Sequence, residues 1–337
     1  MKKHRRPLSS SDATWLAGAA VLFVGLAVVP VSVGDYDLAT IRDIMLFALF
    51  AVGLDLFWGR SGILSFGHAT FFGVGAYGMA IATVKLGLPG GFGSIVGLGL
   101  GTALASLLAF GVGYFLIRGG VRGAYFTITT LALSLIAQQT AVGWSSVTGG
   151  DSGLIGVPAL GYDELRFSDP IAQFYLVWGV LLAVSLGAWS VLRGRHGLVL
   201  KMIEDNEVKA ETLGYSTSLY LIVLFTLSAT VAALAGALYA TMTGFVAPDM
   251  LGLILSTEVI MWVATGGRGL ILGAIVGTIV VSELQQRISS VDTKLWPMFM
   301  GLFFIAMVFL FPDGLLSVVW RVGALFRRDK PSGEVRR

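Results

Sequence analysis

The 337-residue sequence has no cysteine, and only 13% of its residues are charged. Without cysteine, the chain has no disulfide framework and no thiolate metal site. Because 55% of the residues are hydrophobic, the composition lies outside the range of ordinary water-soluble domains. The net charge of +3 is small and sits mostly at the ends of the chain, a pattern typical of membrane orientation and not of nucleic-acid binding. We therefore expect an integral membrane protein.

Apolar runs of about 17 to 25 residues, the length that crosses a bilayer as a helix, recur along the chain. The run TWLAGAAVLFVGLAVVPVSV is apolar on every side, whereas barrel strands alternate in polarity. The sequence therefore predicts an all-α, polytopic bundle of about ten crossings, or eight if GILSFGHATFFG or the region 266–269 is re-entrant. The ten expected runs are 14–33, 40–58, 68–86, 93–117, 123–142, 170–192, 218–245, 251–265, 269–285 and 296–317.

The ends of the chain are basic. The run after MKKHRRPLSSSDA is longer than the apolar part of a secretory signal and lacks a small-residue cleavage site, so we expect a retained first span. We expect a basic cytoplasmic N-terminus (1–13), a membrane domain (14–317) with a polar loop at 193–218, and a basic cytoplasmic tail (318–337). Every second connection then also lies in the cytoplasm, in agreement with its basic residues: Arg60, Arg118, Arg122, Arg193, Arg195, Lys201 and Arg268.

The polar loop contains the most charged stretch of the interior, KMIEDNEVKAETLG. Helical spacing predicts one amphipathic helix over 198–213, and Gly214 is suited to end it in a left-handed conformation. Four acids and two lysines lie on its polar face, whereas helices that lie on membranes favour basic residues there, so a protein partner is indicated. The predicted apolar stripe is Val199, Met202, Ile203, Asn206, Ala210 and Leu213.

Several motifs carry a family resemblance. The segment GRHGLVLKMIEDNEVKAETLGYSTSLYLIVLFTLSATVAALAGALYA resembles the coupling loop and following span of the permease subunits of branched-chain amino acid ABC importers, the LivM type. GLDLFWGRSGILSFGHATFFGVGAYGMA, VTGGDSGLIGVP, GGRGLILGAIVGTIV and LFFIAMVFLFPDGLL are similar to other parts of that family, in the same order, across about 37–318. The resemblance implies that the helix inserts into a cytoplasmic ATPase. The candidate coupling residues are Met202, Ile203, Glu204, Asn206, Glu207, Ala210 and Gly214.

The resemblance also implies the partners of the chain. They are cytoplasmic ABC ATPase subunits, a second homologous permease subunit and a periplasmic binding protein that delivers the substrate, all at a bacterial inner membrane. The chain has no G-x-x-x-x-G-K-[ST] phosphate loop, so ATP would be bound by another chain. We expect no cofactor, no metal and no catalytic residue, and hence a transport subunit and not an enzyme.

Ionisable residues inside apolar runs are costly, and each needs a partner or a functional role. We expect Asp55 to pair with Arg60, His68 to be packed or to cap a helix, and Glu283 to lie at the membrane interface. Glu258 is the deepest candidate and is expected to pair with Arg268 or with a polar group of another span, or to line the transport route. The candidate route residues are Ser65, His68 and Glu258. Ser65 and His68 are included because SFGHATFF has the pattern of a half-helix whose free amides bind a carboxylate, and Glu258 because of its depth.

Alternative functions remain open from the sequence. An ion-coupled secondary transporter or channel fits the hydropathy but would not need a docking helix. A membrane-embedded enzyme is disfavoured, because H-E-x-x-H and clustered His and Asp residues are absent. Within the family, STEVIMWVATGGRG resembles urea and short-amide permeases, whereas VTGGDSGLIGVP resembles amino acid permeases. We expect branched-chain or related amino acids as the substrate, with urea or short amides as the alternative.

Overall fold

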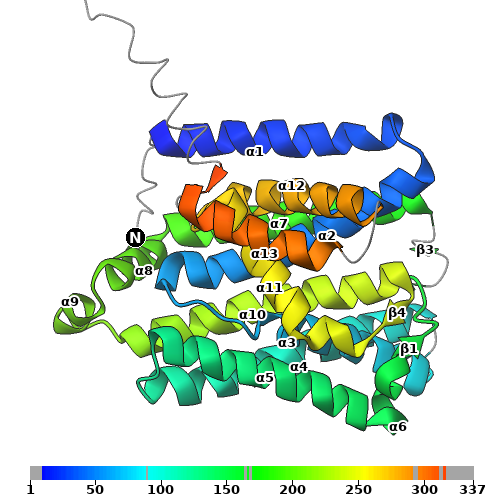
Figure 1. Cartoon of the computed structure of the whole chain (residues 1–337), viewed down its shortest axis with the longest axis horizontal. Helices are drawn as coiled ribbons and strands as arrows, with labels where there is room; N and C mark the ends of the chain where they lie inside the picture. The colour runs from blue at the N-terminus through cyan, green and yellow to red at the C-terminus, as the bar shows by residue number, and fades with distance from the viewer. Residues whose placement is uncertain are drawn as a thin grey trace, which may run out of the picture.

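The structure is a computed structural model that describes residues 10–88, 90–162, 165–166, 169–290, 295–310 and 314–315. Among these residues, ten helices form the body of the molecule (Figure 1). They are α1 (Ser10–Val28), α2 (Asp35–Ser61), α3 (His68–Ala80, extended by the π-helical turn η2, Ile81–Lys85), α4 (Gly90–Arg118), α5 (Gly123–Gly143), α7 (Pro170–Arg193), α10 (Thr217–Thr243), α11 (Leu253–Gly266), α12 (Ile271–Ser289) and α13 (Leu295–Leu310).

Short elements connect these helices. They are η1 (Val29–Val31), α6 (Ser145–Thr148), η3 (Gly150–Ser152), β1 (Leu154–Ile155), β2 (Gly161–Tyr162), β3 (Leu165–Arg166), α8 (Arg195–Asp205), α9 (Glu207–Thr212), β4 (Phe245–Val246) and η4 (Pro248–Leu251). β1 pairs with β4 in antiparallel register, which ties the connection after α5 to the end of α10. β2 and β3 form a separate two-stranded hairpin.

The all-α membrane fold predicted from the sequence is confirmed. Each of the ten predicted runs coincides with one of the ten helices, although the end of the last run falls outside the described residues. Within the described part, five helices are long and apolar enough to cross a membrane by themselves: α4, α5, α7, α10 and α12. The 14 residues of α11 extend only about 21 Å, less than the roughly 30 Å of hydrocarbon in a bilayer.

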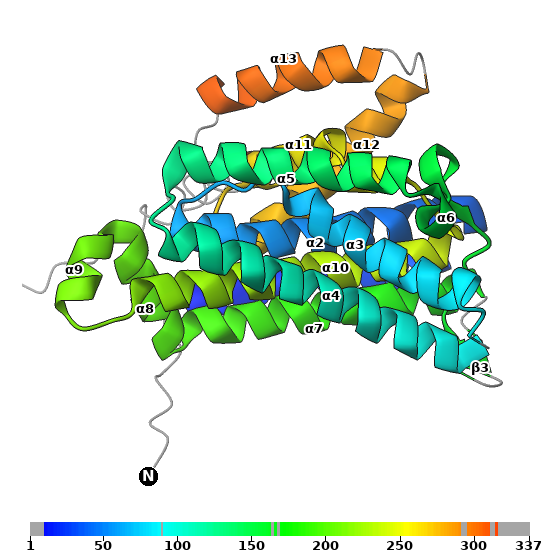
Figure 2. The same ribbon diagram turned by 90° about the horizontal axis from the view of Figure 1, so that it is seen from below.

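The third predicted run starts differently from an ordinary span. After α2 ends, residues 62–67 run without helical structure back into the bundle, where α3 begins at His68 (Figure 2). The hydroxyl of Thr127 on α5 donates to the carbonyl of Leu64 at 2.9 Å, and the amide of Phe66 donates to the Thr130 hydroxyl at 3.2 Å. These bonds satisfy backbone groups that a non-helical segment leaves open inside a membrane.

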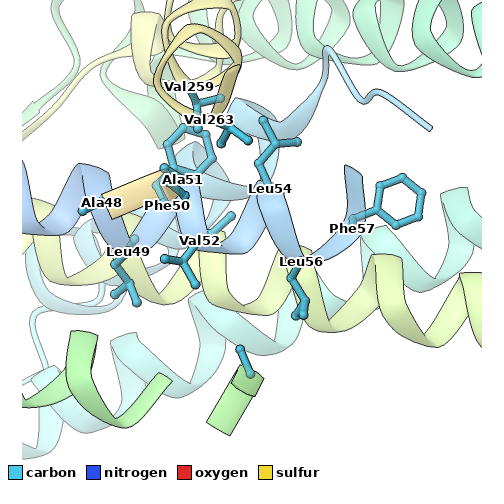
Figure 3. Close-up of a cluster of buried hydrophobic side chains, with 14 of the residues drawn as sticks. Ala48, Leu49, Phe50, Ala51, Val52, Leu54, Leu56, Phe57, Val259 and Val263 are labelled. Atoms are coloured by element: carbon cyan, nitrogen blue, oxygen red, sulfur yellow. The ribbon is translucent and has the colours of Figure 1, made fainter. Parts of the chain in front are cut away.

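Helix α10 lies at the centre and packs against α2, α3 and α4. Glycines allow the close approach: a Cβ at Gly236 of α10 would lie 1.9 Å from the carbonyl oxygen of Phe72. A Cβ at Gly75 of α3 would lie 2.1 Å from the carbonyl oxygen of Ala233 on α10. Small residues at such contacts let membrane helices pack backbone to backbone, as the glycine content suggests. The core continues from α2 to α11, where Val259 and Val263 join the buried α2 side chains (Figure 3).

The two ends of the bundle differ. Helices α8 and α9 project from one end, and α6, β1 and β4 gather at the other (Figure 1). Contacts link the basic connections at the α8–α9 end, because Arg60 bonds to the Gly269 carbonyl and Arg122 pairs with Glu207. The connections that carry Arg60, Arg122 and Arg268 therefore lie at one end, in agreement with alternating crossings.

Candidate functional site

The polar loop forms an elbow, by which we mean α8 and α9 together. The single helix predicted over 198–213 is wrong, because Asn206 breaks it with extended backbone angles of φ −165° and ψ 103°. The Asn206 side-chain oxygen accepts the amide hydrogen of Lys209 at 2.9 Å, which caps α9. Asparagine favours helix caps over helix interiors, so the break follows from the residue type.

The break changes which side chains are buried. Val199, Ile203 and Ala210 of the predicted stripe are buried, whereas Leu213 is 61% exposed. Leu200, which the stripe omits, is also buried. The two helices of the elbow line an open pocket together, with Leu198, Lys201, Met202, Asp205, Asn206 and Lys209 on its walls.

Glycine ends the elbow as the sequence predicts. Gly214 has a φ of +86°, and its amide donates to the carbonyl of Glu211 at 2.8 Å. The amide of Tyr215 reaches back to the carbonyl of Ala210 at 3.2 Å. This pair of bonds is the Schellman arrangement, in which glycine tolerates the left-handed residue at low cost.

An ion pair joins the elbow to the bundle. Arg122, the residue before α5, donates from Nη2 to Glu207 Oε1 at 2.9 Å and from Nε to Oε2 at 3.2 Å. Arg122 Nη1 also donates to the carbonyl of Ile117 at the end of α4, at 2.6 Å. The hydrogen bonds from Arg122 lower the pKa of Glu207 despite its partial burial. Both residues are recognisable in the sequence as charged residues of the predicted cytoplasmic connections. The sequence gives no sign that they contact each other.

The expected Asp55–Arg60 pair is not formed. Asp55 Oδ1 instead accepts the amide hydrogen of Gly269 at 2.6 Å, and Arg60 Nη2 contacts the Gly269 carbonyl at 3.5 Å. The end of α2 therefore binds both the amide and the carbonyl of Gly269, in the turn between α11 and α12. Sequence reasoning missed this partner because the turn lies more than 200 residues along the chain.

Ser65 and His68 are both fully buried. The His68 ring stacks on Phe50 with centroids 6.0 Å apart, and its Nε2 lies 3.0 Å from the Ser228 hydroxyl. The expectation that His68 is packed is confirmed. The prediction of free backbone amides is wrong at two positions, because the Phe66 and Ala69 amides donate to the hydroxyls of Thr130 and Ser256.

Glu258 lies half-buried at the side of a pocket. Its Oε1 accepts from Gln285 Nε2 on α12 at 3.1 Å and from Trp296 Nε1 on α13 at 3.2 Å. The second of its two expected pairings, with polar groups of other spans, is therefore the one observed. The pocket, of about 250 Å³, is lined by Phe47, Phe72, Tyr239, Asp249, Met250, Ile254, Leu255 and Glu258.

This pocket combines aromatic rings with carboxylates. Tyr239 lies 5.3 Å from Phe47 and 5.7 Å from Phe72 between ring centroids. Aromatic faces attract cations and apolar groups, and carboxylates attract ammonium groups. The arrangement is suited to a small solute that carries a positive charge next to an apolar group.

Comparison with known proteins decides the family. The family model described as "Branched-chain amino acid transport system / permease component" matches residues 38–308. The chain belongs to this family. It is 28% identical over 312 residues to the high-affinity branched-chain amino acid transport system permease protein LivM of Salmonella typhimurium, covering 86% of this chain and 71% of that relative.

Two more relatives extend the comparison. The LivM permease of Escherichia coli K12 is 28% identical over 311 residues, with the same coverage of 86% and 71%. The autoinducer 2 import system permease protein LsrC of Yersinia enterocolitica is 29% identical over 218 residues, covering 64% of this chain and 58% of that relative. No solved structure matches the chain.

The match includes the functional elements of this permease. Residues 38–308 contain most of α2, the 62–67 segment, the elbow and the pocket around Glu258. The described part shows no group of three or more His, Cys, Asp or Glu side chains placed to hold a metal ion. The family assignment makes the chain a transmembrane transport subunit of an ABC importer.

Proposed function

We propose that this permease moves branched-chain or related amino acids across the inner membrane, driven by an ATPase that is a separate chain. The single observation that carries the proposal is the family match over 38–308, which contains both the elbow and the pocket. The names of the LivM relatives supply the substrate class. A second homologous permease subunit and a periplasmic binding protein complete the proposed transporter.

The orientation belongs to the same proposal. We place the α8–α9 end, the N-terminal region 1–13 and the tail 318–337 in the cytoplasm. The support is the concentration of basic connections at this end, since such residues are retained on the cytoplasmic side. The membrane domain is proposed as 14–317, with 193–218 as its coupling loop.

The elbow is the proposed docking element for the ATPase. Its acidic outer surface includes Glu204 and Asp205, both exposed, and the apolar Val208 is 69% exposed. A helix pair that exposes acidic side chains next to an apolar one fits a groove with complementary charge and an apolar wall. The proposed coupling residues stay those predicted: Met202, Ile203, Glu204, Asn206, Glu207, Ala210 and Gly214.

Co-purification tests the docking proposal. Glu204→Lys reverses an exposed charge, and we expect it to abolish recovery of the ATPase with the permease. Gly214→Pro is expected to do the same, because proline cannot adopt a positive φ. Glu283→Lys, on an exposed part of α12, is the matched control and should retain the ATPase. Normal recovery with both elbow variants would refute the proposal.

The pocket is the proposed outer part of the transport route. Glu258 and Asp249 would attract the ammonium group, and the rings of Phe47 and Tyr239 would contact the apolar side chain. We expect Glu258→Gln to reduce uptake about tenfold, whereas Glu283→Gln should not change it. Equal uptake by both variants, at equal amounts of assembled transporter, would remove the pocket from the route.

Ser65 and His68 are proposed for the inner part of the route. Both are buried in this conformation, so they would meet a substrate only when α5 moves away from the 62–67 segment to which it is bonded. We expect Ser65→Ala, which removes a buried hydroxyl without a partner among the described residues, to alter the substrate affinity more than the stability. If Ser65→Ala and His68→Ala both leave uptake unchanged, this part of the route is refuted.

Uptake tests the substrate. Cells that express the whole transporter are given labelled leucine and challenged separately with excess isoleucine, urea and acetamide. Inhibition by isoleucine alone, lost when the ATPase is inactivated, is the expected result. ATPase-dependent uptake of labelled urea without leucine uptake would overturn the substrate and keep the architecture.

A further inference from the structure

A small pocket at the α8–α9 end shares no lining residue with the pocket of the elbow or with the Glu258 pocket. Its volume is about 190 Å³, and four helices contribute to it. The lining residues are Trp15 of α1, Arg60 of α2, Trp189, Leu192 and Arg193 of α7, and Gly269, Leu270 and Ile271 at the start of α12. The transport function proposed above does not use this pocket.

The polar part of the pocket is cationic. Among the described residues, the Arg60 guanidinium makes one long contact, from Nη2 to the Gly269 carbonyl at 3.5 Å, and its Nε has no partner there. Asp55, the nearby buried acid, is bonded to the Gly269 amide at 2.6 Å and is 2% exposed. Arg60 therefore has donors left for an acceptor that enters the pocket. Arg193 adds a second guanidinium to the same wall.

The other part of the pocket is aromatic. The indoles of Trp15 and Trp189 stack with centroids 5.0 Å apart, and the Arg193 guanidinium carbon lies 5.1 Å from the Trp189 ring centroid. Tryptophan gathers at the level of lipid headgroups in membrane proteins. Paired arginines bind phosphate oxygens with good geometry. The arginines of the pocket are therefore suited to bind a phosphate, and its tryptophans indicate that it lies at the depth of the lipid headgroups.

The surroundings indicate where the ligand comes from. Helix α1 lies at the edge of the bundle (Figure 1), and its outward valines, such as Val21 and Val24, are 76% and 63% exposed. Acyl chains can therefore lie along α1 while a headgroup enters the pocket. A basic pocket between membrane helices at the bilayer surface is a typical site for an anionic headgroup.

We propose that this pocket binds the phosphate of an anionic phospholipid, with Arg60 and Arg193 as the phosphate-binding residues and the Trp15–Trp189 pair beside the glycerol region. The lipid would hold α1 to the ends of α2 and α7 and to the start of α12. It would therefore stabilise the assembled permease without taking part in transport.

The test uses the full transporter in nanodiscs of phosphatidylcholine alone or with phosphatidylglycerol, and measures the melting temperature and the lipids retained in native mass spectrometry. We expect phosphatidylglycerol to raise the melting temperature and to remain bound. Arg60→Gln with Arg193→Gln should weaken the retention about tenfold. Arg118→Gln is the matched control, because Arg118 lies over Tyr114 on α4, away from the pocket, and should retain the lipid.

Control experiments distinguish a bound lipid from free phosphate. If millimolar inorganic phosphate in phosphatidylcholine nanodiscs raises the melting temperature as much as phosphatidylglycerol does, the ligand is free phosphate and the lipid proposal is overturned. Equal retention by the double variant and by Arg118→Gln would also overturn it. If the double variant does not assemble, Arg193→Gln alone is compared with Arg118→Gln in the same way.

Discussion

Helices α10 and α5 are both long apolar spans, yet they are held in opposite ways. In the most apolar stretch of 18 residues of each helix, 67% of the residues of α10 are buried inside the protein, but only 22% of those of α5. Alanines and glycines give α10 a smooth surface that packs backbone to backbone against α2, α3 and α4. Helix α5 instead exposes large side chains, with Tyr125, Ile128 and Ile136 each more than 60% exposed.

Polar bonds hold α5 in place where packing does not. Its start is bonded through Arg122 to Glu207 of the elbow, and its Thr127 hydroxyl donates to Leu64 in the 62–67 segment. Near its middle, the Ser134 hydroxyl donates to the carbonyl of Leu251 in η4. A span attached by a few bonds moves more easily than one packed along its length. This contrast makes α10 the fixed core and α5 the element able to transmit motion from the elbow to the segment before His68.

The largest expected effect is on the fixed helix. Gly236→Ala would place a Cβ 1.9 Å from the backbone oxygen of Phe72, and a backbone atom cannot move aside as a flexible side chain can. We expect a loss of more than about 3 kcal/mol, and little assembled protein in size-exclusion chromatography. Gly111→Ala is the matched control, because nothing lies within 4 Å of a Cβ there. Equal recovery of both variants would show that α10 is not tightly packed.

The second effect concerns transmission through α5. Arg122→Gln removes the ion pair without changing any of the proposed coupling residues, so the ATPase should still co-purify with this variant; Glu207→Gln removes the same pair from the other side. We expect uptake to fall about fivefold, the equivalent of the ~1 kcal/mol that a partly exposed pair contributes. The double variant should be no worse than Arg122→Gln, because Arg122→Gln already removes the ion pair and the bond to the Ile117 carbonyl. Additive losses would mean that the two residues act separately.

A smaller effect is expected at the other anchor of α5. Ser134→Ala removes the hydroxyl that donates to the Leu251 carbonyl, and both groups lie in the buried interior. We expect a loss of about 1 kcal/mol in stability, visible as a lower melting temperature, with uptake retained. Thr129→Val is the control, because within the described part of the chain the Thr129 hydroxyl is bonded only inside α5, to the Tyr125 carbonyl. A larger loss for Thr129→Val would contradict this role of Ser134.

The sequence predicted the local features of this architecture better than the distant ones. The ten apolar runs and the left-handed Gly214 follow from composition and residue type, which act within a few residues. The partners of Glu258 and Arg122 lie on other helices and that of Asp55 lies in a distant turn, and no periodicity shows which elements become neighbours. The break at Asn206 had a local signal, but the apolar stripe on both sides outweighed it in the prediction of one helix.

The smallest expected effect is the pH dependence of the Arg122–Glu207 pair. Arg122 lowers the pKa of Glu207 below its ordinary value of 4.5, so the pair stabilises the folded protein above that value. The contribution is lost only as the pH falls through the lowered pKa. Wild type and Glu207→Gln should therefore differ in uptake by a constant factor between about pH 6 and 8, measured in vesicles with the pH held equal on both sides. A ratio that changes within this range would mean that another group titrates against Arg122, and that α5 is coupled to the elbow through more than this ion pair.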